Sequence, residues 1–303
     1  MGERDDWLAL VARIRRHTQK EYRAPHKPLL LLYALGRISR NEFAPMRYVE
    51  VEADLLVLLR EWGPPNVTKA SYPFRRLAND RGLWLVAGSD GTIAGDERTE
   101  LIRVDATGQL DPAFIEALQR DPGLIVLISR YLLDANWPSS LHEEITGAVG
   151  LDLEDIEVDL VRGRLAVEVR RRDPHFRARV LLAYEYRCAI CGYDGRIDTA
   201  AVGLDAAHVR WFSAEGPDVI ANALCLCSLH HVLLDKGVLG LTPEHTVRAS
   251  KRFIGHSDAA RHLVLRHQGA PMIEPQAGED PVATDHVDWH DREVFRAPAR
   301  IAI

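Results

Sequence analysis

The stretch "LDAAHVRWFSAEGPDVIANALCLCSLHH", from Leu204 to His231, decides the fold of the second half of the chain. It opens with the alternating run "LDAAH", which predicts a strand ending at His208. The run "NALCLC" begins at Asn222, and "HHVLLDKG" predicts a helix that starts near His231. Strand, loop and helix thus carry a histidine, an asparagine and a histidine at intervals of fourteen and nine residues.

Cysteine and histidine residues around this stretch have the spacing of zinc ligands. Cys188 and Cys191 form one pair, and Cys227 and His230 form a second pair after 35 further residues. Each pair can bind one side of a tetrahedral Zn2+ ion. Cys225 is a competing ligand, but only Cys227 keeps the two-residue spacing to His230. The alternative is a set of buried thiols without metal, and the paired spacing favours structural zinc.

The motifs "YRCAICG", "DAAHV", "NALCLCSLHH" and "LLDKGVLGL" resemble the HNH, or ββα-metal, endonuclease family in order and spacing. The resemblance extends roughly from Asp173 to Gly240. It implies that His208 is the general base, that Asn222 fixes the loop and orients this histidine, and that His231 binds a catalytic divalent cation such as Mg2+. These residue types suit phosphodiester hydrolysis, because an imidazole deprotonates water near neutral pH and a cation neutralises charge on phosphoryl oxygens.

One position departs from the family pattern. Many members place an acidic residue or a histidine directly before the general base as a second metal ligand, and here that position is Ala207. Asp205 lies two residues earlier, so its side chain on a strand points the same way. We therefore take Asp205 as the candidate for the missing ligand. Asp235, one helical turn after His231, is the other acid within reach.

The N-terminal half shows helical apolar spacing with a few short strands. We expect an α+β fold with domains at residues 1–150 and 173–303, joined by a linker at 151–172. The stretch at 70–82 is expected to be loop-like and to run into a strand at Leu83–Val86. The expected helices are Trp7–Tyr22, Pro28–Arg40, residues 50–62, Pro112–Arg120, Leu124–Asn136 and one that starts at Asp173.

Two stretches of that half, "YRAPHKPLLLLYALGRI" and "ASYPFRRLANDRGLWLV", resemble the sulfur-binding domain of phosphorothioation-dependent, McrA-like type IV restriction endonucleases. In that family a helical domain recognises double-stranded DNA in which sulfur replaces a non-bridging phosphate oxygen, and an HNH domain follows. The order of the two resemblances matches this arrangement. It implies a restriction endonuclease that cuts phosphorothioate-modified DNA.

A pocket that prefers sulfur needs apolar walls, because sulfur is larger than oxygen and a poorer hydrogen-bond acceptor. Tyr72 and Pro73, with Pro25 or Ala24, are the candidates for these walls. An alternative is a turn at Tyr72–Phe74 whose aromatic rings fill the core. The candidate phosphate-binding cations are His26, Lys27, Arg75 and Arg76, and the candidate base-reading residues are Asn79 and Arg98.

The charge distribution favours a DNA partner although the net charge is −6. Eight arginines lie between residues 162 and 187 and nine Lys or Arg residues lie among the first forty, against three and four acids. Local basic stretches matter more to a phosphate backbone than the overall sum does, although either stretch alone is also consistent with a solvated helix face.

The sequence also bears on location and assembly. It contains no apolar run near the roughly 20 residues of a membrane span, and its charged start is not typical of a signal peptide. Cysteines confined to the C-terminal half indicate metal-bound thiolates in a reducing cytoplasm. One HNH centre cuts one strand, so we expect a homodimer on DNA.

Two other functions stay open at this point. One is an HNH nuclease specific for another mark, such as a methylated base. The N-terminal half has no strand-rich pattern with an obvious base-flipping pocket, which counts against it. The other is a non-catalytic, zinc-containing DNA-binding protein.

Overall fold

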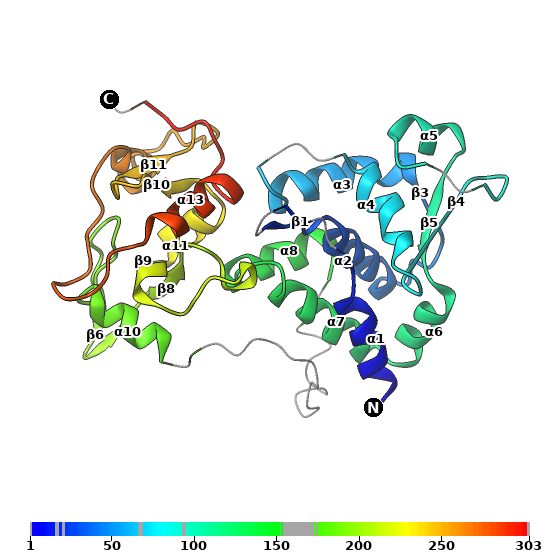
Figure 1. The fold of residues 1–303 in the computed structure, drawn as a ribbon, viewed down its shortest axis with the longest axis horizontal. Helices are drawn as coiled ribbons and strands as arrows, with labels where there is room; N and C mark the ends of the chain where they lie inside the picture. Colours follow the sequence, from blue (N-terminus) through cyan, green and yellow to red (C-terminus); the bar gives the residue numbers. More distant parts are fainter. Residues whose placement is uncertain are drawn as a thin grey trace. The chain divides into compact units, whose positions relative to one another are not determined.

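The computed structural model of the chain describes residues 2–15, 18–19, 22–65, 69–92, 95–151, 153, 173 and 175–301. The chain divides into two compact units, Met1–Val169 and Arg170–Ile303. Both units combine helices with short antiparallel strands, which confirms the predicted α+β fold (Figure 1). Most of the predicted linker lies outside the described residues. Among the residues that are described, no helix is long and apolar enough to cross a membrane.

The N-terminal unit is built around α2, His26–Ser39, which contains the apolar run predicted to be core. Leu29, Leu30, Leu31, Leu32 and Leu35 are all buried. A helix that is apolar on most of its surface must be covered by other elements, and α2 contacts four further helices. These are α3 (Tyr48–Trp62), α4 (Ser71–Arg76), α7 (Gly123–Asp134) and α8 (His142–Val149).

The remaining elements of this unit are shorter. Three strands form a sheet in the order β3-β5-β4, with β5 paired antiparallel to both neighbours. They are β3 (Met46–Arg47), β4 (Trp84–Ala87) and β5 (Thr107–Leu110). The other elements are α1 (Glu3–Ala12), β1 (Thr18–Gln19), β2 (Tyr22–Arg23), η1 (Leu77–Asn79), α5 (Arg98–Arg103), α6 (Pro112–Arg120) and η2 (Ser139–Leu141).

The helix predicted from Trp7 to Tyr22 is too long. In the structure α1 ends at Ala12, and β1 pairs with β2 in the part predicted to be its second half. The helical apolar spacing stops at Ile14, so nothing in the following polar residues holds a helix to the core.

The stretch at 70–82, expected to be loop-like, instead forms α4 and the 3-10 turn η1. Pro73 is tolerated there because it lies in the first turn of α4, where backbone N–H groups have no partner within the helix. The same helix turns Phe74 into the core, where its ring packs edge-on against Tyr48 and Trp84. The core-filling alternative is therefore correct for Phe74.

The C-terminal unit contains the predicted strand, loop and helix. β8 (Leu204–His208) pairs antiparallel with β9 (Ala223–Cys227), and α11 (Ser228–Asp235) follows directly. The helix α10 (Phe176–Ala183) packs on both strands. The other elements are β6 (Arg196–Ile197), β7 (Ala200–Ala201), η3 (Phe212–Ala214), η4 (Ile220–Asn222), β10 (Leu239–Leu241), β11 (Val247–Ala249), α12 (Asp258–Leu263), η5 (Leu265–His267) and α13 (Thr284–Glu293).

The register of the two strands brings the motif residues to one end of the ribbon. His208 is the last residue of β8 and lies opposite Ala223, the first residue of β9. Asn222 therefore stands at the same end, immediately before β9. The loop between His208 and Asn222 closes that end.

Candidate functional site

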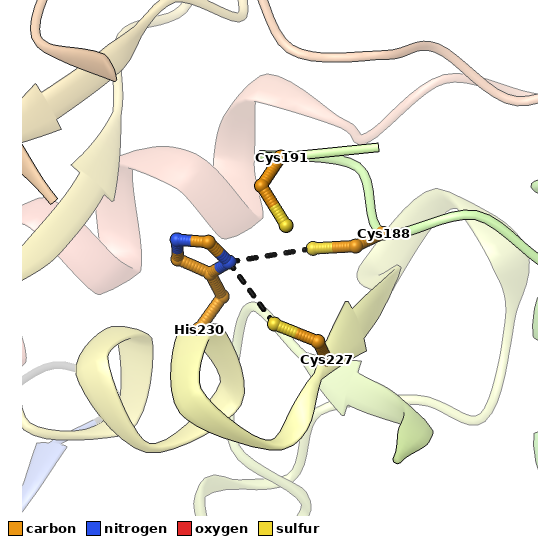
Figure 2. Close-up of side chains that lie close together, drawn as sticks. All are labelled: Cys188, Cys191, Cys227 and His230. Carbon is orange, nitrogen blue, oxygen red and sulfur yellow. Dashed lines mark hydrogen bonds between the residues drawn. The ribbon is translucent and has the colours of Figure 1, made fainter. Parts of the chain in front are cut away.

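Three cysteines and a histidine meet at the base of α11 (Figure 2). Their sulfur and nitrogen atoms all lie within 4.8 Å of one another. The His230 Nδ1 atom is 3.2 Å from the Cys227 sulfur and 3.5 Å from the Cys188 sulfur. Cys191 supplies the third sulfur, and with it the fourth donor atom, from the turn after Cys188 (Figure 2). The structure thus brings together the four residues that the sequence spacing selects.

The surroundings of this cluster fit a structural zinc ion. The His230 Nε2 atom lies 2.7 Å from the Leu263 carbonyl oxygen, which can only accept a hydrogen bond. The Nε2 atom therefore carries the proton, and Nδ1 presents its lone pair to the thiols. Hydrogen bonds from the Cys191 and Cys227 thiols hold the pKa of the Cys188 thiol well below its usual range, which favours the metal-binding thiolate. Three thiolates and one imidazole are a common donor set for Zn2+.

Cys225, the competing candidate, lies outside the cluster. Its side chain is fully buried, and burial raises its pKa to about 12. A thiol with so high a pKa stays protonated and belongs to the hydrophobic core.

His208 lies between a carboxylate and an aromatic ring. Its Nε2 atom is 2.8 Å from Asp218 Oδ1, and both side chains are 13% exposed. The Phe176 ring of α10 stacks on the imidazole with ring centres 4.4 Å apart and planes inclined by 21°. The ring of Phe212 lies at 5.9 Å on a tilted plane. The imidazole is thus held in a defined orientation and keeps some contact with solvent.

Asn222 is fully buried and ties the loop after His208 together. Its Oδ1 atom accepts a hydrogen bond of 2.8 Å from the Arg210 N–H, and its Nδ2 atom donates to the carbonyl oxygens of Arg210 and Pro217, both at 3.0 Å. Its own carbonyl accepts from the Val209 N–H. The contacts fix both ends of the loop that follows the histidine.

His231 faces away from the cysteine cluster, toward two carboxylates. Its Nε2 atom is 3.3 Å from Asp235 Oδ2, and its Nδ1 atom is 3.7 Å from Asp205 Oδ2. Asp205 is 52% exposed and forms an ion pair with Arg177 at 3.1 Å, whereas the Asp235 side chain is only 1% exposed. Ala207, the position of the missing ligand, is fully buried.

Two cationic side chains lie over the ring of Tyr72 on the N-terminal unit. The ring is partly exposed, with the Lys69 Nζ atom 5.3 Å and the Arg76 guanidinium carbon 4.0 Å from its centre. Pro73, Pro25 and Ala24 are buried, so Tyr72 is the one member of the predicted apolar set with accessible surface.

Acids that the sequence reasoning missed pair with three of the predicted contact residues of this unit. Lys27 pairs with Asp80 at 2.5 Å, Arg76 with Asp96 at 2.7 Å, and Arg98 with Glu52 at 2.6 Å. Lys69 likewise pairs with Glu97 at 2.8 Å. The pairs join the start of α2 to the residue after η1, α4 and the segment before it to the residues before α5, and the start of α5 to α3. The other predicted contact residues are His26 and Arg75, which are partly buried, and Asn79, which is exposed.

Comparison with known proteins gives one family match in each of the two units. Residues 4–154 match the ScoMcrA-like DNA sulfur-binding domain family, and residues 188–242 match an HNH endonuclease family. A comparison with curated proteins gave no match.

Three similar solved structures have related descriptions. The sulfur-binding domain of SprMcrA complexed with phosphorothioated DNA is 22% identical, with a TM-score of 0.42, over 49% of this chain and 96% of that one. The corresponding ScoMcrA domain complex is 20% identical, with a TM-score of 0.41, over 50% and 97%. The type IV phosphorothioation-dependent restriction endonuclease ScoMcrA is 21% identical, with a TM-score of 0.37, over 50% of this chain and 28% of that one.

The family matches decide the assignment, because the similarity to these solved structures is low. As the sequence motifs predicted, the chain carries a ScoMcrA-like DNA sulfur-binding domain followed by an HNH endonuclease domain.

Proposed function

We propose that this protein is a modification-dependent restriction endonuclease that binds phosphorothioate-modified DNA through its N-terminal unit and cuts nearby phosphodiester bonds with its C-terminal unit. The proposal depends above all on one observation, the presence in one chain of a sulfur-binding domain and an HNH domain. The sulfur-binding match favours this reading over recognition of a methylated base, and the HNH match favours hydrolysis over DNA binding alone.

In this proposal His208 is the general base. It lies at the end of β8, partly accessible, and its ring is oriented by Asp218 and Phe176. An imidazole in this setting can take a proton from a water molecule that attacks phosphorus. Asn222 holds the loop after the base through three side-chain hydrogen bonds and does not take part in proton transfer.

A divalent cation such as Mg2+ supplies charge neutralisation at the phosphoryl group when it is bound. An imidazole with carboxylate oxygens fits such an ion, although its identity is not fixed by these donors. The two nitrogens of His231 face different carboxylates. In this ring orientation, a cation bound to one nitrogen can therefore be shared with only one of the two carboxylates.

We place Asp235, rather than Asp205, beside His231 in this cation site. Asp205 is bound by Arg177 and would have to leave that ion pair. Asp235 lies one helical turn from His231, with its Oδ2 atom 3.3 Å from His231 Nε2. The zinc ion would be purely structural, since its four protein donors leave no position for water.

On the N-terminal unit, Tyr72 is the proposed contact for sulfur and the cations around it are the proposed contacts for the DNA backbone. The partly exposed ring offers an apolar edge, and Lys69 and Arg76 supply positive charge beside it. In the absence of DNA those cations are bound to carboxylates, and the phosphates would replace these partners. Arg98 and Asn79 stay candidates for base contacts.

Two further expectations complete the proposal. A single centre cuts one strand, so a double-strand break requires two copies, and we propose dimerisation on DNA. The thiolates of the zinc cluster require a reducing compartment, which is consistent with action on DNA in the cytoplasm.

The test is a cleavage assay with the full chain and plasmids that differ only in backbone phosphorothioation, with Mg2+ or Mn2+ in separate reactions. The expected result is cutting of the modified plasmid only, and its loss in His208→Ala with zinc content and thermal unfolding unchanged. Equal cutting of both plasmids contradicts the proposed specificity. Cutting by the His208→Ala variant contradicts the proposed base.

A further inference from the structure

We infer that Asp218 is the positioning residue of the nuclease site, holding His208 in the Nε2-protonated tautomer and stabilising the imidazolium that forms when water is deprotonated. The inference rests on the proposed role of His208 as general base.

The contact between the two side chains determines the tautomer. Asp218 Oδ1 lies 2.8 Å from His208 Nε2, and an ionised carboxylate can only accept a hydrogen bond. The Nε2 atom must therefore carry the proton when the imidazole is neutral, and Nδ1 carries the lone pair that takes a proton from water. The small exposure of both side chains limits competition from solvent.

The carboxylate of Asp218 is itself fixed by contacts from α10 and the residues before it. Its Oδ2 atom accepts from the Asp173 N–H at 2.8 Å, and its backbone carbonyl accepts from Arg179 Nη2 at 2.9 Å. Arg179 also pairs with Asp173 at 2.8 Å. Both oxygens of Asp218 are thus used, one by the base and one by the scaffold.

Asn222 links the backbone just after His208 to the backbone just before Asp218. Its Nδ2 atom donates to the carbonyls of Arg210, two residues after His208, and of Pro217, directly before Asp218. The loop therefore carries the base at its start and the positioning carboxylate near its end, and one buried amide holds the two together. Phe176 covers one face of the His208 imidazole. A flip of the imidazole ring would place a ring carbon, instead of Nε2, against the Asp218 carboxylate.

The other charged groups around His208 are largely paired with one another. On α10, Arg177 is bound to Asp205, and Arg179 is bound to Asp173. On α11, His231 faces Asp205 and Asp235, and the residues of β9 are apolar or thiols. The Asp218 carboxylate is the group that lies within 2.8 Å of His208 Nε2.

In the proposed step the water oxygen forms a bond to phosphorus while its proton passes to His208 Nδ1. The bond from phosphorus to the leaving oxygen breaks, that oxygen takes a proton from solvent, and the imidazolium later returns its proton to solvent. Asp218 accepts the same hydrogen bond throughout and takes no proton itself, as expected of an orienting carboxylate.

The test compares Asp218→Asn with the unaltered full chain in single-turnover cleavage of a phosphorothioated duplex, across the pH range in which histidine titrates. We expect the plateau rate to fall on the order of 10²-fold while affinity for the duplex is unchanged. The acid limb of the pH–rate profile should move to lower pH, because an anion next to an imidazole favours its protonated form. Asp280→Asn, an exposed position, is the matched control.

A second measurement does not depend on the folding of a variant or on a bound cation. Nitrogen-15 NMR of the unaltered protein, with the His208 signal assigned by its loss in His208→Gln, reports the tautomer directly. The Nε2–H form is expected, and the Nδ1–H form overturns the inference.

The His208→Ala variant separates the two claims. If it is inactive while Asp218→Asn keeps the normal rate and pH profile, Asp218 is not a positioning residue and the base assignment stands. If His208→Ala still cuts, the base assignment fails and the role of Asp218 fails with it.

Discussion

His230 and His231 are neighbours on α11, yet their imidazoles face different groups. His230 Nδ1 points to the sulfurs of Cys188 and Cys227, whereas His231 points to the carboxylates of Asp205 and Asp235. Adjacent residues on a helix lie about 100° apart around its axis, so one short helix can serve two sites. The soft donors on one side suit zinc and the hard donors on the other suit a cation that binds phosphate oxygens.

The first prediction separates these two neighbours. His230→Ala should lose the zinc ion and lower the unfolding temperature, because a structural zinc contributes directly to folding. His231→Ala should keep one zinc per chain but cut on the order of 10²-fold more slowly or worse. Metal analysis, thermal unfolding and cleavage rates check both variants, with the exposed His256→Ala as control. Loss of zinc in His231→Ala would contradict the assignment of the two histidines to different metal sites.

The second prediction concerns the acid beside His231. Asp235→Asn should raise the Mg2+ concentration needed for half-maximal cleavage at least about tenfold, since a carboxylate ligand is lost. Asp205→Asn should have a much smaller effect, because Arg177 already binds that carboxylate. A titration of the cleavage rate with Mg2+ measures both. The reverse order of effects would make Asp205 the ligand.

The third prediction follows from the partly exposed ring of Tyr72. Tyr72→Ala should reduce the preference for sulfur over oxygen by about 1–3 kcal/mol, because water then reaches the site and an oxygen is no longer penalised. Tyr72→Phe keeps the ring and should keep the preference. Competition binding between paired duplexes, carried out in the His208→Ala background to prevent cutting, measures the ratio. An unchanged ratio in Tyr72→Ala would remove this residue from the sulfur contact.

The fourth prediction concerns the acids that pair with Arg76 and Lys69, two of the cations proposed to contact DNA. Asp96→Asn with Glu97→Gln should release Arg76 and Lys69 and raise affinity for modified and unmodified duplexes alike, by roughly two- to fivefold. The salt dependence should steepen, since more cations exchange with phosphate counterions. Glu116→Gln, which removes an exposed acid on α6, is the control. Weaker binding by the double variant would show that the acids order the site instead of competing with DNA.

The sequence predicted the zinc donors of the C-terminal unit more fully than the ion pairs of the N-terminal unit, and the reason lies in sequence distance. Within each pair of zinc donors only two residues intervene, so local geometry brings the two side chains of a pair together, and all four donors meet in the structure. The partners of the N-terminal cations come from far along the chain. Lys27 pairs with Asp80, and Arg98 pairs with Glu52, contacts that only tertiary packing creates.

Two features that the sequence did not predict, the role of Asp218 and the helix α4, also depend on the folded structure. Asp218 lies ten residues after His208 in a Gly-Pro loop with no periodic signal, and only the folded loop reveals their contact. The stretch that forms α4 was expected to be loop-like, whereas the first turn of a helix accepts its proline. A search for acidic residues within the loop finds both Glu215 and Asp218, and only the structure shows which of them contacts His208.

The central claim is that one chain recognises a phosphorothioate and cuts the DNA that carries it. Its most direct test is the affinity of the full chain, as the His208→Ala variant, for one duplex with and without a single Rp phosphorothioate. We predict that the modified duplex binds at least about tenfold more tightly, which corresponds to about 1.4 kcal/mol. Equal affinity for the two duplexes would contradict the account.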